Sequence, residues 1–384
     1  MIGVIADDLT GAAELGGIGF RYGLSAKVVL EADRGGETEL LCSDTDSRSA
    51  PLEAAGRLAA TAARALTAAG ANWVYQKVDS VLRGHVAVEL EAVINQLGLR
   101  RVLLVPANPG LGRVIRNECY FIGGKPIHET DFRLDPEYPC GTPWVRELLG
   151  TAISLPVQVC RLRERLPPNG IVIGECETAA DLRQWAGRWD DSTLAAGAAE
   201  FFAALLETLG RSPARAFAGP SAASTARPEL FVCGSTSESC RAFVTRSRDH
   251  GVPVVCLPEE TARGVEFAPS ECERLAERVK AALQSNPRVI LAVGLPPVTD
   301  RRVARQLVGH LTGIAAAVMQ QSTVGHVYVE GGATATSLTR KMNWKHLSVK
   351  CEVAPGVVTL QPAGERSRLL TLKPGSYVWP KGVS

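Results

Sequence analysis

Four polar side chains within seven residues mark the stretch from Tyr75 to His85 as a candidate for chemistry. Its sequence, YQKVDSVLRGH, contains Lys77, Asp79, Ser80 and Arg83. Two cations around one carboxylate suit an anionic substrate that also has a hydroxyl group to activate. An ion-paired loop that caps a helix is the other interpretation, and the stretch by itself does not decide between the two.

The neighbouring residues predict where this stretch lies in the fold. Residues 73–75 are apolar and aromatic, which predicts a half-buried strand. From Val86 the apolar residues recur at helical spacing, so residues 80–84 lie where a strand gives way to a helix. Ligands of α/β proteins usually bind at the carboxyl ends of strands, so this position favours a binding site.

A second strand end, near the start of the chain, carries two adjacent carboxylates. Residues 2–6 form a short apolar strand that leads into Asp7, Asp8 and Thr10, and a helix follows. Adjacent carboxylates are costly to bury unless something uses or satisfies them. Capping of the helix by Asp8 or Thr10 is the structural alternative for one of them.

Two more strand ends have the same character. A strand at residues 40–42 runs into SDTDSR, which ends at Arg48. After a strand at residues 102–105, the chain as far as about residue 143 is rich in Pro, Gly and charge. A loop of this length inside a compact domain is usually functional. Arg113 is its candidate residue, with an exposed, solvated arginine as the alternative.

The second half of the chain carries glycine turns instead. Predicted strands end at GSTS, which contains Ser235 and Ser237, and at EGGATA, which begins at residue 330. Glycines between a strand and a helix bring backbone N–H groups close to an anion, and the helix dipole adds to the attraction. One such turn is explained equally well by tight packing, but two favour phosphate binding. Gly356 and the segment LKPG, residues 372–375, add a third glycine turn and a cation.

Length and rhythm predict the architecture. A chain of 384 residues exceeds one typical core and indicates two domains. The alternation of strands and helices predicts an α/β fold, in which each domain is a mostly parallel sheet flanked by helices, with a cleft between the domains. We place the N-terminal domain at residues 1–213 and the C-terminal domain at 229–384. Residues 214–228 are small, polar and Pro-bearing, which is typical of a linker.

Composition excludes several classes of function. A net charge of +2 gives no electrostatic reason to expect a nucleic-acid partner. The N-terminus lacks the basic start of a signal peptide, and no apolar run reaches spanning length, so we expect no membrane segment. The ten cysteines contain no CxxC and the six histidines no HxxxH. Zinc and disulfide frameworks are therefore not expected, and reduced thiols in the cytoplasm are the default.

Taken together, these motifs resemble the four-carbon acid sugar kinase family. The N-terminal motifs are IADDLTGAAE near the start, TDSRS at 45–49, KVDSVLRG at 77–84 and PANPGLGR at 106–113. The C-terminal ones are GSTS at 234–237, EGGATA at 330–335, the turn at Gly356 and LKPG at 372–375. They occur in the order found in the family and span nearly the whole chain.

The resemblance implies an activity and its partners. Members of this family use ATP to phosphorylate acid sugars such as threonate, erythronate and 3-oxo-tetronates in carbohydrate catabolism. Their N-terminal domain holds the sugar acid and their C-terminal domain holds the nucleotide, with Mg²⁺ on the ATP. A small sugar acid and ATP are thus the implied partners, and a homo-oligomer stays open.

Residue roles follow from the same resemblance. Asp8 is the expected base that orients or deprotonates the attacking hydroxyl, Asp79 competes for that role, and Asp7 shapes the loop or binds metal. Arg83 is the expected ligand of the sugar carboxylate, since a planar guanidinium pairs bidentately with one. The other groups implied around the sugar acid are Arg48, Lys77, Ser80, Gly84 and Arg113. The implied ATP contacts are Ser235, Ser237, Gly331, Gly332, Ala333, Thr334, Gly356 and Gly375.

Two other functional classes remain as alternatives. A catalytically silent sensor of sugar acids could use the same scaffold. A phosphatase of the haloacid dehalogenase type also opens with a strand followed by Asp and Thr, but it requires Asp-x-Asp-x-Thr, and Leu9 and Thr10 follow Asp8 here. The exact acid, its stereochemistry and the hydroxyl that is phosphorylated stay open.

Overall fold

The chain divides into two compact units, Met1–Arg215 and Ala216–Ser384. The computed structural model describes residues 1–30, 37–135, 137–150, 152–218, 227–264, 267–295, 298, 300–375 and 377–383. The division falls inside the predicted linker at 214–228, of which residues 219–226 lie outside the described ranges.

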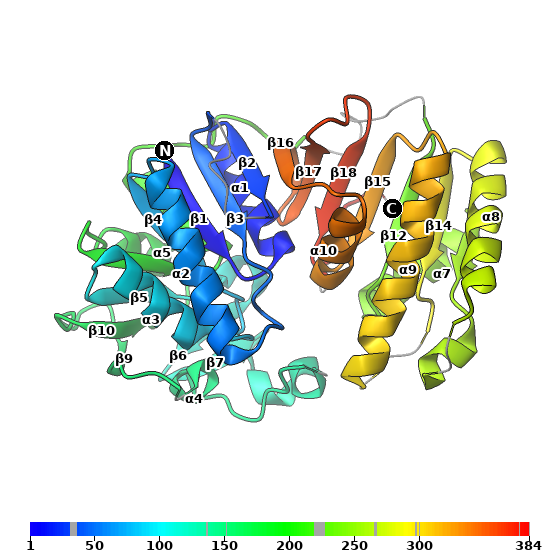
Figure 1. Cartoon of the computed structure of the whole chain (residues 1–384). Helices are drawn as coiled ribbons and strands as arrows, with labels where there is room; N and C mark the ends of the chain where they lie inside the picture. Colours follow the sequence, from blue (N-terminus) through cyan, green and yellow to red (C-terminus); the bar gives the residue numbers. More distant parts are fainter. Residues whose placement is uncertain are drawn as a thin grey trace. The chain divides into compact units, whose positions relative to one another are not determined.

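The first unit is built on a parallel sheet, in which eight strands lie within the described residues (Figure 1). Their order across the unit is β2-β3-β1-β4-β11-β5-β10-β9. Most are buried apolar runs, as expected for a parallel sheet covered on both faces. The strands are β1 (Ile2–Ala6), β2 (Ala26–Val29), β3 (Leu40–Asp44), β4 (Trp73–Lys77), β5 (Arg101–Val105), β9 (Val157–Cys160), β10 (Gly170–Gly174) and β11 (Thr193–Gly197).

Helices cover both faces of this sheet. On one face, α2 (Leu52–Ala68) and α3 (Val86–Leu97) lie side by side (Figure 1) and bury Ile5, Leu41 and Val74 in a common core. The other face carries α1 (Leu9–Arg21), α5 (Ala179–Ala186) and α6 (Ala199–Thr208). Gly19 of α1 lies against Leu40 so closely that an added Cβ would come within 2.1 Å of its Cδ2 atom. The predicted α/β class is confirmed in this unit.

The long predicted loop after β5 has secondary structure of its own. It forms a small antiparallel sheet of β6 (Arg113–Arg116), β7 (Cys119–Ile122) and β8 (Lys125–Pro126). Short 3₁₀ helices flank it at Pro109–Leu111, Ile127–Glu129 and Asp131–Leu134, and α4 (Val145–Leu149) follows. Elements this short contain too few residues for a period to emerge from the sequence. We call residues 106–149 the β6–β8 excursion.

The second unit repeats the layered plan with a mixed sheet. Within the described residues its strand order is β13-β14-β12-β15-β18-β17-β16, in which the pairs β18–β17 and β17–β16 are antiparallel and the other pairs are parallel. The predicted mostly parallel sheet is therefore confirmed here too. The strands are β12 (Glu229–Cys233), β13 (Val254–Cys256), β14 (Arg288–Ala292), β15 (His326–Glu330), β16 (His346–Ala354), β17 (Val357–Pro362) and β18 (Leu369–Lys373).

Its helices also lie on both faces. α8 (Pro269–Ser285), α9 (Arg301–Gln321) and α10 (Gly332–Lys341) pack in a row (Figure 1). On the other face, α7 (Glu238–Asp249) contributes Phe243 to an aromatic core with Phe231, Tyr328 and Trp379. No helix of the described residues is both long enough and apolar enough to cross a membrane.

The strand register aligns the carboxyl ends within each unit. In the first unit Ala6 pairs with both Asp44 and Lys77, so the residues after β1, β3 and β4 meet at one edge. In the second unit Glu330 pairs with both Cys233 and Lys373, which brings the ends of β12, β15 and β18 together. These two edges carry the predicted functional residues.

Candidate active site

One arginine holds both carboxylates that follow β1. Arg48 donates from Nε to Asp7 Oδ2 at 2.6 Å and from Nη2 to Asp7 Oδ1 at 2.7 Å. Its Nη1 atom donates to Asp8 Oδ2 at 2.9 Å. Gly84 lies against this pair with a φ of +96°, and an added Cβ would come within 3.3 Å of Arg48 Cγ. Both the backbone conformation and the close approach therefore favour glycine at this position.

Asp8 also caps α1. Its Oδ1 accepts from the backbone N–H of Gly11 at 2.8 Å, and its Oδ2 accepts from Thr10 Oγ1 at 2.7 Å. Burial raises the pKa of Asp8, but the charges of Arg48 and Lys77 and these hydrogen bonds outweigh it and hold the pKa below its ordinary value. The structural alternative, that Asp8 caps the helix, is confirmed, and the cap is ionised.

Three buried carboxylates at this edge of the sheet, Asp7 among them, have raised pKa values. Burial raises the pKa of Asp7. Burial and the charge of Asp7 raise the pKa of Glu89, on α3, to about 8, and Ser47 Oγ donates to Glu89 Oε1 at 2.6 Å. Burial and the charge of Asp46 raise the pKa of Asp44 well above its ordinary value. Sequence reasoning did not single out Glu89 or Asp44, although Asp44 belongs to the SDTDSR segment.

Asp79 and Arg83 form a forked ion pair. Arg83 donates from Nε to Asp79 Oδ2 at 3.0 Å and from Nη2 to Asp79 Oδ1 at 2.8 Å. Its Nη1 atom donates to Asp135 Oδ2 at 3.0 Å. Burial raises the pKa of Asp79, but the charges of Arg83 and Arg48 outweigh it and hold the pKa well below its ordinary value. The ion-paired interpretation of this stretch therefore holds for these two residues.

Lys77 is the last residue of β4 and is 5% exposed. Its Nζ atom donates to the carbonyl of Val78 at 2.9 Å and lies 3.6 Å from Glu14 Oε2 on α1. An added Cβ at Gly11 would lie 3.5 Å from Nζ, so the ammonium group sits directly beside the first turn of α1.

Arg113 reaches this edge from the β6–β8 excursion. Its Nη1 atom donates to Ser80 Oγ. The guanidinium carbons of Arg113 and Arg83 lie 5.7 and 5.4 Å from the ring centroid of Phe132. Within the described ranges Arg113 has no carboxylate partner, which distinguishes it from Arg48 and Arg83.

The excursion supplies further groups that the sequence did not reveal. Tyr138 donates its hydroxyl to the carbonyl of Arg48, and Tyr120 donates its hydroxyl to the carbonyl of Ser80. Asp135 and Phe132 of the same excursion contact the guanidinium groups of Arg83 and Arg113. Their only sequence signal is the length of the loop that carries them.

The glycine turns of the second unit meet one another. Ser237 caps α7 by accepting from the backbone N–H of Cys240 at 3.3 Å, and its hydroxyl donates to the carbonyl of Gly375 at 3.0 Å. An added Cβ at Gly375 would come within 3.2 Å of Ser235 Oγ and 3.8 Å of Gly331 Cα. Three turns that are far apart in the sequence are thus in contact.

Gly234 leaves no room for a side chain, because an added Cβ would lie 1.9 Å from Thr334 Oγ1. Gly332, Ala333 and Thr334 form the first turn of α10, where backbone N–H groups lack acceptors within the helix. Gly356 forms the hairpin turn between β16 and β17. Continuing the register beyond the pair Val358–Leu372 sets it opposite Pro374.

Lys373 is 1% exposed and points into the sheet rather than toward a ligand. Its Nζ atom lies 3.2 Å from Glu330 Oε1 and donates to the carbonyls of Pro374 at 2.9 Å and Tyr377 at 2.5 Å. Trp379 Nε1 donates to Glu330 Oε2 at 3.1 Å. Two carbonyl acceptors and one carboxylate therefore surround the ammonium group. The cation of the LKPG segment therefore holds the glycine turn in place.

Two buried thiols lie beside this ion pair. One potential ligand atom from each of Cys233, Cys240 and Glu330 lies within 4.8 Å of the others. Their spacing is not that of a CxxC motif, because Cys233 ends β12 and Cys240 lies on α7. The ammonium group of Lys373 is already paired with Glu330, so the positive charge that a metal ion would supply to this cluster is already present.

Two family models and several known kinases match the chain. Residues 2–205 match the family model described as "Sugar-binding N-terminal domain", and residues 230–377 match "Nucleotide-binding C-terminal domain". A D-threonate kinase of Cupriavidus necator is 28% identical over 97% of this chain and 94% of its own length. A 3-oxo-tetronate kinase of Methylobacterium radiotolerans is 25% identical over 98% and 96%. The chain belongs to the four-carbon acid sugar kinase family.

Solved structures with the family's fold agree in architecture. The Haemophilus influenzae protein HI1011 superposes with a TM-score of 0.70 at 21% identity, covering 97% of this chain and 96% of the other. A Salmonella typhimurium protein described as a putative tRNA synthase gives a TM-score of 0.76 at 19% identity, covering 98% and 96%. At these identities the likeness shows the fold alone.

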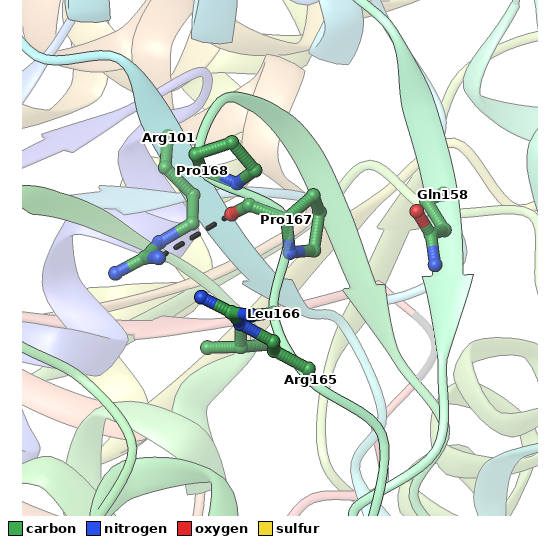
Figure 2. Close-up of a pocket in the computed structure, with 6 residues that line it drawn as sticks. All are labelled: Arg101, Gln158, Arg165, Leu166, Pro167 and Pro168. Carbon is green, nitrogen blue, oxygen red and sulfur yellow. Dashed lines mark hydrogen bonds between the residues drawn. The ribbon is translucent and has the colours of Figure 1, made fainter.

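A separate cavity of about 610 Å³ in this family member lies away from both edges. Arg101 begins β5, so the cavity is at the amino end of that strand (Figure 2). The Arg101 guanidinium donates hydrogen bonds to the carbonyl of Pro167, to Thr193 and to Asp190, so few of its N–H groups remain for a ligand. This cavity is therefore not our candidate for the active site, despite its volume. Its lining residues are Arg101, Gln158, Arg165, Leu166, Pro167 and Pro168.

Proposed function

We propose that this protein transfers the γ-phosphoryl group of ATP to a hydroxyl group of a four-carbon acid sugar. The observation that carries the proposal is the meeting of Asp7, Asp8, Arg48 and Lys77 at one sheet edge, in the unit that matches the sugar-binding family model. Relatives named for threonate, erythronate and 3-oxo-tetronate support acids of this class. The proposal includes a cytoplasmic location, where ATP is available.

The attacking hydroxyl needs orientation more than a strong base, because the transition state of phosphoryl transfer is loose. Its O–H bond breaks as the new P–O bond forms, the bond from the γ-phosphorus to the bridging oxygen breaks, and ADP leaves. We assign the proton to Asp8. Asp79 is the rival, but both of its oxygens are held in the fork of Arg83.

We assign the remaining polar groups of this edge to the acid. Arg48 and Lys77 supply positive charge, and Ser80 supplies a hydroxyl. Gly84 leaves room for Arg48, and Asp7 fixes the position of that arginine. Arg113 joins them from the β6–β8 excursion.

We assign the triphosphate to the three glycine turns of the second unit. Backbone N–H groups at the start of α10 and α7 favour anions, and the contact between Gly375 and Ser235 supports a single binding surface. The residues proposed for ATP are Ser235, Ser237, Gly331, Gly332, Ala333, Thr334, Gly356 and Gly375.

Mg²⁺ would neutralise charge on the phosphates when bound. It commonly binds through the phosphates and a few carboxylates. Glu330 lies just before the glycines of EGGATA but does not fit as a ligand, because it is fully buried, is paired with the Lys373 ammonium group and accepts a hydrogen bond from Trp379. We therefore propose that Mg²⁺ binds together with the nucleotide.

The test is ADP formation by the purified protein with ATP, Mg²⁺ and a panel of four-carbon acids. We expect ADP with at least one of threonate, erythronate and a 3-oxo-tetronate. Tight binding of an acid without ADP would favour the sensor instead. Release of phosphate from phosphorylated acids without nucleotide would favour a phosphatase.

A further inference from the structure

We propose that Arg113 is the ligand of the substrate carboxylate, and that Arg83 is instead the fixed partner of Asp79. This assignment rests on the proposed function and makes it more specific. It identifies the residue that distinguishes an acid sugar from a neutral sugar of the same length.

The forks of two arginines at this edge are already filled. Arg48 binds Asp7 with two parallel hydrogen bonds, and Arg83 binds Asp79 in the same way. A substrate carboxylate that took either fork would displace a protein carboxylate that is less than a tenth exposed. A buried carboxylate without its partner is strongly unfavourable, so neither exchange favours binding.

Arg113 has no such partner. Its hydrogen-bonding contact within the described ranges is with the neutral hydroxyl of Ser80. A guanidinium has five N–H donors, so most of them remain for a ligand. The ring of Phe132, 5.7 Å from the guanidinium carbon, holds its plane, and a planar fork matches a carboxylate.

The backbone fixes where this guanidinium lies. Arg113 and Asn108 exchange backbone hydrogen bonds of 2.7 and 3.1 Å, which ties the start of β6 to the residues just after β5. Tyr120 fixes the backbone of Ser80 by donating to its carbonyl. The hydroxyl of Ser80 accepts from Arg113 and can donate its own hydrogen to the same carboxylate.

A second polar group at this position also lacks a partner. Asn108 is 3% exposed, and its Oδ1 atom has no hydrogen-bond partner within the described ranges. A buried acceptor left unsatisfied is rare in native structures and requires an explanation. A hydroxyl group of the same acid supplies the missing donor.

The test compares an acid with its own amide, which has the same shape but no charge. Arg113→Gln and the wild-type protein are titrated by calorimetry with D-threonate and with D-threonamide, and ADP formation is measured in parallel. We expect Arg113→Gln to weaken acid binding roughly 30- to 100-fold and amide binding less than about threefold. The affinity of Arg113→Lys for the acid should lie between those of Arg113→Gln and the wild-type protein, because the charge stays while the fork is lost.

Arg116→Gln is the matched control. Arg116 lies on the same strand, its guanidinium lies 4.6 Å from the Phe121 ring, and its side chain is 48% exposed. The Arg116→Gln variant should bind D-threonate and D-threonamide with the affinities of the wild-type protein.

Equal losses for acid and amide in Arg113→Gln, or no loss, would overturn the assignment. Loss of the acid preference in Arg83→Gln, with Arg113→Gln unaffected, would return it to Arg83. Absence of ADP with every acid of the panel contradicts the proposed function, whereas a charge-independent loss contradicts the Arg113 assignment alone.

Discussion

Arg48 and Asp7 form a two-pronged ion pair across 41 positions of the sequence, and the pair ties the loop after β3 to the end of β1. Asp7 is 2% exposed, so the arginine is what makes a carboxylate tolerable at this strand end. Gly84 completes the arrangement by leaving room for the Arg48 stem. Two adjacent aspartates thus share one cation, and each has a different structural role.

Loss of Arg48 should destabilise the fold. Arg48→Gln leaves Asp7 buried without its partner, and breaking a buried pair in this way typically costs about 3–5 kcal/mol. Denaturant unfolding measures the change. Arg57→Gln, on the exposed side of α2, is the control and should stay within about 0.5 kcal/mol of wild type. The double variant Arg48→Gln/Asp7→Asn should recover part of the loss, and strictly additive effects would contradict the pairing.

Asp8→Asn should separate chemistry from folding. Asparagine caps a helix about as well as aspartate, so the cap on α1 survives the substitution. We expect kcat to fall by roughly 10²–10⁴, with little change in the KM for ATP. Steady-state kinetics decide the matter, and near-normal turnover would move the base elsewhere.

The rival Asp79 makes a different prediction. Asp79→Asn leaves the partly buried cation of Arg83 with Asp135 as its remaining carboxylate partner. We therefore expect Asp79→Asn to lower the melting temperature. A fully stable Asp79→Asn protein without activity would favour Asp79 as the base.

Glu89 should make stability depend on pH. Its folded-state pKa is about 8, above the ordinary value of 4.5, so its contribution is complete below pH 4.5 and is lost as the pH rises through 8. Glu89→Gln cannot ionise, so its unfolding free energy relative to wild type should rise with pH in that window. The slope is at most about 1.4 kcal/mol per pH unit. A difference that stays constant from pH 5 to about 8.5 would show that Glu89 does not titrate there.

Gly234→Ala should damage nucleotide binding and spare acid binding. The new methyl group would lie 1.9 Å from Thr334 Oγ1, so the GSTS and EGGATA turns must separate. We expect weaker ATP binding by calorimetry and unchanged affinity for the acid. Gly309→Ala on α9 meets nothing within 4 Å and should stabilise the protein by roughly 0.5–1 kcal/mol. Unchanged ATP affinity in Gly234→Ala would contradict the role of these turns.

The buried pair of Glu330 and Lys373 should act on ATP through the Gly375 turn. Lys373→Met removes the donors to Pro374 and Tyr377 and leaves Glu330 without its cation. We expect a lower melting temperature and a higher KM for ATP at unchanged KM for the acid. Glu330→Gln/Lys373→Met should be more stable than Lys373→Met, because no unpaired charge remains. A double variant less stable than either single one would contradict this.

The polar residues at the strand ends could be predicted from the sequence, whereas the residues of the β6–β8 excursion that contact them could not. Asp7, Arg48 and Lys77 follow apolar runs, and parallel strands bring such residues to one edge. Asp135 and Tyr138 could not be found in this way, because they lie in an excursion whose strands are two to four residues long. Their contacts join positions 52 and 90 residues apart, and no local pattern encodes such pairing.

Individual side chains were harder to predict than the turns that carry them. The LKPG segment indicated a glycine turn and a cation, and both are present. Whether Lys373 points outward or inward depends on Glu330, its partner on the neighbouring strand. The same holds for Arg83, whose fork is filled by Asp79 four residues before it.

The most direct measurement is the identification of the product. The purified protein is incubated with ATP, Mg²⁺ and each acid of the panel, and the acid is analysed by phosphorus NMR and mass spectrometry. We predict that one acid gains a phosphate ester, that ADP forms in equal amount, and that Asp8→Asn slows both by roughly 10²–10⁴-fold. Unmodified acids throughout, from a folded protein that binds ATP, would contradict this prediction.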